Sequence, residues 1–77
     1  VTVRFFAQLR SAVGVSEMHV SIPPGSSVRH LADTLETQYE GLTLRGSMCA
    51  VNEAYAEPDT TLAGGETVAF LPPVSGG

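Results

Sequence analysis

A single helical stripe of apolar residues in the middle of the chain constrains the fold more than any other feature. Between Ser27 and Gly41, apolar side chains recur at the spacing of one helix face. They are Val28, Leu31, Ala32, Leu35 and Tyr39. Ser27 is a typical N-cap residue and Gly41 a typical C′ residue. An amphipathic helix of this length is marginal alone, so the rest of the chain must supply a layer that covers the stripe.

Strand-like segments surround this helix on both sides. Alternating apolar and polar residues predict strands over residues 1–9, 17–22, 48–51, 54–56 and 66–71. One helix crossing one sheet gives a two-layer α+β domain. With the first and last strands side by side, this order predicts a β-grasp, or ubiquitin-like, fold. We expect a mixed sheet of four to five strands crossed by one main helix.

Turn-forming residues separate the predicted strands. We expect a polar loop over Ser11–Ser16, with Gly14 as its turn residue. Asn52-Glu53 predicts a turn between two short strands, and Pro58–Thr61 is also turn-like. Gly64-Gly65 predicts a tight turn before the last strand.

Length and charge limit the classes of function. The 77 residues allow one small domain, which we assign to residues 1–72, with a flexible Gly-Gly tail over residues 73–77. The formal net charge of −4 argues against nucleic acid as a partner. No apolar run approaches the roughly 20 residues of a membrane span, and no signal-peptide pattern opens the chain. We therefore expect a cytoplasmic protein without a membrane partner.

Side chains that carry chemistry are few. Cys49 is the one cysteine, and its apolar surroundings in the sequence predict an ordinary core residue. His19 is expected on a polar strand face and His30 in the first helical turn, and neither lies beside a plausible nucleophile. The acidic residues show no metal-ligand spacing. We expect no bound cofactor, no metal and no catalysis by this chain alone.

The C-terminal segment is the exception. Pro72-Pro73 ends the last predicted strand and stiffens the exit from the domain. Ser75, Gly76 and Gly77 add almost no side-chain bulk, and glycine adopts backbone angles closed to other residues. Such a tail can thread a narrow channel and present an unhindered carboxylate. A frayed terminus has the same composition, but the diproline favours a carboxylate that enters another protein's active site.

The C-terminal run FLPPVSGG, residues 70–77, resembles that of the molybdopterin synthase small subunits, the sulfur carriers of molybdenum-cofactor biosynthesis. Val3–Ala7 with Leu9-Arg10, Ala50–Asn52 and the glycine turn are also similar to that family. The resemblance spans essentially the whole chain. One departure is the turn, where the family usually continues Gly-Asp-Glu and this chain has a second glycine. We interpret the missing aspartate as a turn residue.

The resemblance implies a role for the tail. In the family, a ubiquitin-activating-like adenylyltransferase uses ATP to adenylylate the terminal glycine carboxylate. A sulfur donor, a sulfurtransferase or desulfurase, then leaves a thiocarboxylate. On Gly77, this group would donate sulfur to a cyclic pterin precursor held by the large subunit of molybdopterin synthase. Gly76 would permit passage into that subunit, which would contact Pro72, Pro73, Val74 and Ser75. The family implies a heterotetramer of two small and two large subunits.

Phe6 breaks the pattern of the first strand. It shares a face with Arg4, the face expected to meet water. Leu71 and Tyr55 are expected on the same side of the sheet, so the three residues predict an exposed apolar patch. The family implies that the large subunit and the activating enzyme dock there, with Arg10 near the rim. The competing interpretation is that Phe6 packs under a loop.

Three other functions fit the same residues. A sulfur carrier of the thiamine type would share the chemistry, although the diproline argues against it. A ubiquitin-like protein modifier would be conjugated to its targets through Gly77. A binding module would use the fold and leave the C-terminal carboxylate unreacted.

Overall fold

The computed structural model describes residues 1–44 and 46–72. The predicted tail, residues 73–77, lies outside the described residues, as does Arg45. The elements in chain order are β1 (Thr2–Phe5), α1 (Gln8–Val13), β2 (Glu17–His19), β3 (Ser26–Ser27), α2 (Val28–Gln38), β4 (Met48–Val51), β5 (Ala54–Ala56), β6 (Thr61–Leu62) and β7 (Thr67–Leu71).

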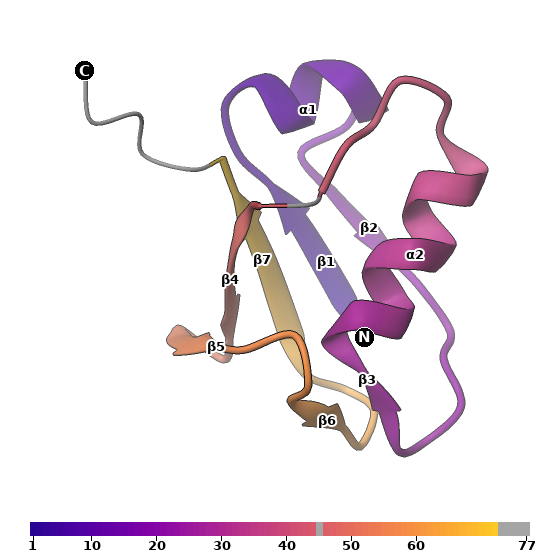
Figure 1. Cartoon of the computed structure of the whole chain (residues 1–77), viewed down its shortest axis with the longest axis vertical. Helices are drawn as coiled ribbons and strands as arrows, with labels where there is room; N and C mark the ends of the chain where they lie inside the picture. The colour runs from indigo at the N-terminus through magenta and orange to yellow at the C-terminus, as the bar shows by residue number, and fades with distance from the viewer. Residues whose placement is uncertain (45, 73–77) are drawn as a thin grey trace.

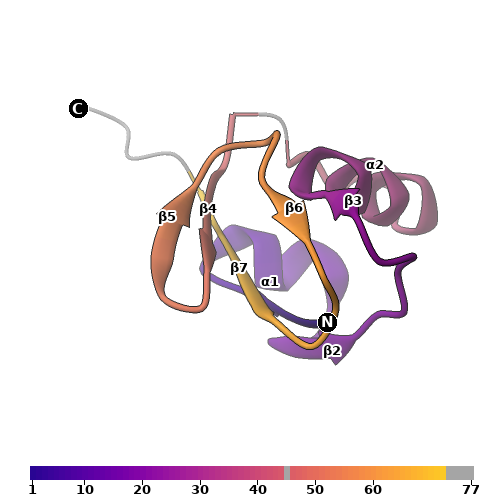
Figure 2. The same cartoon turned by 90° about the horizontal axis from the view of Figure 1, so that it is seen from below.

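The central sheet has five strands in the order β2-β1-β7-β4-β5 (Figure 1). Strands β1 and β7 pair in parallel, and the remaining neighbours pair antiparallel. Helix α2 lies on one face of this sheet, as a view turned by 90° also shows (Figure 2). The predicted β-grasp fold, with a mixed sheet, one main helix and the first and last strands side by side, is confirmed.

The core lies between α2 and the inner face of the sheet. Val3 and Phe5 of β1 alternate with outward residues, as Val68 and Phe70 of β7 do, and all four are buried. The Phe5 and Phe70 rings stack with centroids 6.2 Å apart. The other buried apolar residues are Leu9, Val28, Leu31, Leu35, Leu42, Leu44, Cys49 and Leu62. The predicted helical stripe is therefore the helix's contribution to the core.

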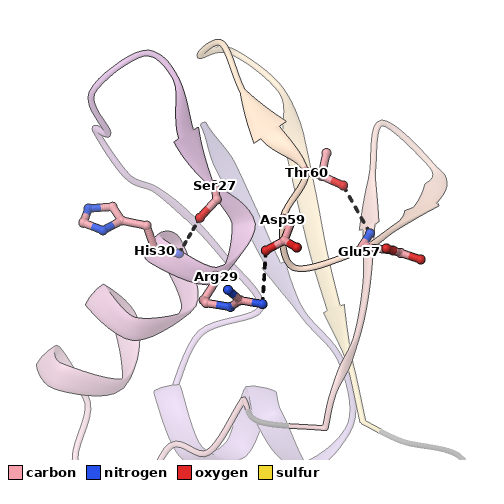
Figure 3. A network of polar contacts seen from close by, with 6 residues as sticks. All are labelled: Ser27, Arg29, His30, Glu57, Asp59 and Thr60. Atoms are coloured by element: carbon pink, nitrogen blue, oxygen red, sulfur yellow. Dashed lines mark hydrogen bonds and ion pairs between the residues drawn. The ribbon is translucent and has the colours of Figure 1, made fainter.

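The loop between β5 and β6 contacts the first turn of α2 (Figure 3). Ser27 is the N-cap, and its hydroxyl accepts the His30 N–H, as the sequence predicts. The two backbone N–H groups before His30 also donate hydrogen bonds. That of residue 28 donates to the Thr60 carbonyl and that of residue 29 to the Pro58 carbonyl. Arg29 lies at the positive end of the helix dipole, and Asp59 lies 3.1 Å from its guanidinium.

The other end of α2 departs by one residue from the prediction. The last helical residue is Gln38, and Tyr39 is the C-cap. Gly41, with a φ of 87°, therefore follows C′ instead of occupying it.

The segment after β1 differs from the prediction. The first strand ends at Phe5 instead of Leu9, and part of the expected loop over Ser11–Ser16 is the short helix α1. Ala7 has a φ of 53° and a ψ of −130°, which turns the backbone out of the strand. The turn carries Leu9 into the core, where burial of its side chain stabilises the helix. Gly14 does end the segment as predicted, in the left-handed region at a φ of 93°.

Two more boundaries were wrong. The regular part of the second strand covers Glu17–His19 and not residues 17–22, although Val20 and Ile22 still pack against the core. The predicted turn at Pro58–Thr61 ends one residue early, because Thr61–Leu62 pairs with Ser26–Ser27 in a second, two-stranded sheet. Leu62 is fully buried, and this burial fixes the small sheet beside the start of α2.

Candidate functional site: the outer face of the sheet

The outer face of the sheet, opposite α2, gathers the side chains that the core does not use. The strand register aligns Arg4 with Ala69, Ala69 with Ala50, and Ala50 with Tyr55. The same register places Leu71 opposite Met48, at the end where β7 leaves the sheet. The face therefore has a row of small residues in its middle and larger apolar residues at the end of the sheet where β7 finishes.

Phe6 lies at that exit, beside β7. Its backbone N–H donates to the carbonyl of Phe70 at 3.3 Å, and 38% of the residue is exposed. The guanidinium carbon of Arg4 lies 5.5 Å from the centre of the Phe6 ring, within the range of a cation–π contact. Phe6 is thus open to solvent on the same face as Arg4, and the alternative, packing under a loop, is not what the structure shows.

The other two residues of the predicted patch lie on this face, but the patch is not continuous. Leu71 is half-buried, whereas Tyr55 is 75% exposed on the edge strand β5. Ala69 and Ala50 separate Tyr55 from the Phe6 side of the sheet. We call Phe6, Met48, Leu71 and Tyr55 the docking surface from here on, after the role that the sequence predicts for this face.

Sequence reasoning missed Met48, which is 37% exposed. The available signal was its alternation with Cys49, which is buried on the opposite face of β4. Arg10 is exposed on α1, the helix that follows β1, and its predicted place at the rim stays a prediction. Pro72 is half-buried after β7. Pro73, Val74, Ser75, Gly76 and Gly77 lie outside the described residues.

The glycine turn fixes where β7 begins. The Glu66 carboxylate accepts the N–H groups of Ala63 at 2.8 Å and Gly64 at 2.7 Å, and these hydrogen bonds hold the pKa of Glu66 below its usual range. The Glu66 carbonyl accepts the Thr2 N–H at 2.9 Å, which seats β7 against β1. Gly65, at a φ of 86°, occupies the position where the family usually has aspartate. Glu66 therefore closes this turn without that aspartate.

Reactive groups elsewhere have ordinary surroundings. Cys49 is buried as predicted, and burial raises the pKa of its thiol to about 11. His19 Nδ1 lies 3.1 Å from the Thr2 hydroxyl, on the exposed end of the outer face. Within residues 1–44 and 46–72, no group of three or more histidine, cysteine or acidic side chains could hold a metal ion. No helix in the same part of the chain is long and apolar enough to cross a membrane.

The fold and its outer face define a ubiquitin-like β-grasp protein with accessible apolar side chains beside the end of its last strand. The sequence profile of the ThiS family matches residues 3–77, and the chain belongs to this family. The molybdopterin synthase sulfur carrier subunit of Escherichia coli (strain K12) is 35% identical over 80 residues, covering 100% of this chain and 99% of that protein.

Solved structures agree with this assignment. A protein of Pyrococcus furiosus described as molybdopterin converting factor subunit 1 has a TM-score of 0.80 and 30% identity, covering 95% of each chain. The complex of subunits 1 and 2 of the molybdopterin-converting factor of Helicobacter pylori 26695 contains a chain with a TM-score of 0.68 and 25% identity. That match covers 99% of this chain and 96% of the other.

Proposed function

We propose that this protein is the sulfur-carrier subunit of a molybdopterin synthase. The observation that carries the proposal is the pairing of the family's fold with an exposed docking surface at the end of β7. Met48 and Leu71 are paired there, and the Phe6 N–H donates to the Phe70 carbonyl beside them, immediately before the segment that ends in Gly77. Relatives similar over the whole chain are molybdopterin synthase sulfur carrier subunits, which supports this pathway over the thiamine type.

The chemistry that we propose lies at the carboxylate of Gly77. A carboxylate is a poor acylating agent, so its oxygen first attacks the α-phosphate of ATP and releases pyrophosphate. The acyl adenylate has a good leaving group, and sulfide delivered by the donor then attacks the acyl carbon, expels AMP and leaves a thiocarboxylate. The activating enzyme binds the ATP, and this chain supplies only the carboxylate and its folded handle. Because activation consumes ATP, we propose a cytoplasmic location.

The large subunit is the partner that receives the sulfur. The structure of a relative in complex with subunit 2 of its converting factor supports such a partner here. We propose that the docking surface binds the large subunit while residues 73–77 enter its active site. Tethering the sulfur in this way converts a bimolecular reaction into a local one. Two carriers and two large subunits would form the heterotetramer, and the acid–base groups would come from the large subunit.

High-resolution mass spectrometry of the C-terminal peptide tests the proposal. The protein is incubated with the activating enzyme, ATP and a sulfur donor, with one sample lacking ATP as the control. A thiocarboxylate on Gly77 replaces one oxygen by sulfur, and its exact mass separates it from oxidation of Met18, Met48 or Cys49. An unmodified Gly77, where a known carrier is converted, would contradict the proposal. Covalent attachment of Gly77 to other proteins in cells would instead indicate a modifier.

A further inference from the structure

A shallow hollow on the outer face lies next to the docking surface and has no role in the function proposed above. Its volume is about 460 Å³, and its floor is formed by Thr67 and Ala69 of β7. Arg4 and Phe6 rise on the β1 side, with Glu17 beyond them on β2. Asn52 and Glu53 of the turn between β4 and β5 form the other wall. The hollow exists because the side chains of the floor are short and those of both walls are long.

The charges around the hollow are unequal. Its lining contains two carboxylates, Glu17 and Glu53, and one guanidinium, Arg4. Glu17 Oε1 lies 3.8 Å from Arg4 Nε, so this acid and base face each other on the same wall. Glu53 stands on the opposite wall, with β7 between it and Arg4. A partner that covers this face therefore meets an excess negative charge at the turn, in a chain whose net charge is −4.

The backbone conformation at Glu53 is also unusual. Asn52 and Glu53 have φ values of 50° and 70°, the left-handed pair expected in a two-residue hairpin turn. Asparagine accepts this region readily, whereas the second position favours glycine, and glutamate there is strained. The chain thus holds a carboxylate at a turn position where glycine would make a more stable hairpin.

We propose that the hollow receives a lysine or arginine side chain of the docking partner, whose charged end pairs with Glu53 and whose stem lies over Ala69. This inference rests on the proposed function, because the partner is the large subunit bound to the adjoining docking surface. The hollow and that surface share Phe6, so one partner covers both. Glu53 would then favour large subunits that carry a basic side chain at this position.

The test measures the affinity of the full chain for the large subunit encoded in the same genome, by isothermal titration calorimetry at low and high salt. Glu53→Gln should weaken binding about fivefold and Glu53→Lys about thirtyfold, and added salt should reduce both effects. Asp33→Lys is the matched control: it makes the same charge change on α2, on the other side of the sheet, and should alter binding less than about twofold.

Glu53→Gly separates recognition from stability. It removes the carboxylate and the backbone strain together, so it should raise the midpoint of thermal unfolding while weakening binding about as much as Glu53→Gln. If Glu53→Lys binds as well as the unaltered chain, or more tightly, the partner group is not basic and the inference is wrong. If Phe6→Asp also leaves binding unchanged, the docking surface itself is misassigned, whereas the proposed function fails only if Gly77 is not converted to a thiocarboxylate.

Discussion

The two faces of the sheet differ in this small domain: the inner face is buried against α2 and the outer face is accessible to solvent. Along β1 and β7, every second side chain faces α2 and is buried, and the residues between them face outward and stay accessible. Val3, Phe5, Val68 and Phe70 stabilise the fold, while Arg4, Phe6, Ala69 and Leu71 are available to a partner. Because the alternation is strict, a substitution on one face should leave the property carried by the other face almost unchanged.

The largest effect is expected for a substitution in the core that the inner face builds with α2. Leu31 is fully buried under the sheet, so Leu31→Ala should lower the free energy of unfolding by about 2–5 kcal/mol. Urea unfolding followed by circular dichroism measures this change. Tyr55→Ala on the outer face is the control and should stay within about 0.5 kcal/mol of the unaltered chain. Equal losses for both variants would contradict the division between the faces.

The matching substitution on the outer face is Phe6→Asp. A charge at the Phe6 position of the docking surface should weaken binding of the large subunit at least about a hundredfold. The midpoint of thermal unfolding should move little, because Phe6 lies outside the core. Surface plasmon resonance and a thermal melt of the same sample check both expectations. Wild-type affinity in the folded variant would show that the docking surface is misassigned.

The rate at which a thiol is labelled can be compared at two adjacent residues of β4 that face opposite sides of the sheet. Cys49 is buried, and its pKa of about 11 keeps it protonated at neutral pH, so it should react slowly with a disulfide reagent in native buffer. Moving the thiol by one residue, with Cys49→Ala and Ala50→Cys together, transfers it to the outer face. Labelling should then be about a hundredfold faster, whereas both proteins should react alike in denaturant. Equal native rates would show that β4 does not separate the two faces.

Ala7 lies at the point where the chain leaves β1 beside Phe6. Its φ of 53° and ψ of −130° suit glycine, so Ala7→Gly should raise the free energy of unfolding by about 1 kcal/mol. Ala12→Gly, inside α1, is the matched control and should lower it by about 0.5–1 kcal/mol. Chemical denaturation measures both. A loss of stability in both variants would mean that Ala7 is not strained.

The smallest effect should come from Glu66. Because its hydrogen bonds lower its pKa in the folded chain, the stability that it adds is present above the ordinary carboxyl pKa and is lost as pH falls through the lowered value. Glu66→Gln should therefore make thermal unfolding less sensitive to pH between about 5 and 3. Glu57→Gln, an acid on the surface without these bonds, should leave the pH dependence unchanged. An unaltered pH profile for Glu66→Gln would contradict this account of the turn.

Sequence patterns predicted the elements whose periodicity and stop signals agree. The stripe of α2, its N-cap at Ser27, and the strands of residues 48–51 and 54–56 around Asn52-Glu53 were all correct. Helix α1 was missed because apolar residues continue at every second position from Val1 to Leu9, apart from the additional Phe6, and only the spacing of Leu9 and Val13 indicated a helix. The small sheet of β3 and β6 was missed because two-residue strands carry no periodicity.

The docking surface was predicted only in part. The exposure of Phe6 follows from the alternation in β1, and the structure confirms it. The separation of Phe6 from Tyr55 by two alanines depends on the register of four strands, and no single segment encodes that register. The hollow between Arg4 and Glu53 could not be predicted for the same reason. The roles of Gly76 and Gly77 remain predictions.

The parallel pairing of β1 with β7 also has a consequence for how the domain assembles. The centre of the sheet joins the first strand of the chain to the last, so its contacts have high sequence separation and form slowly compared with local ones. No partial sheet made from the first half of the chain can bury Val3 and Phe5 in this way. We therefore expect the docking surface to form only when β7 is in place, so that a chain lacking that strand cannot compete for the partner.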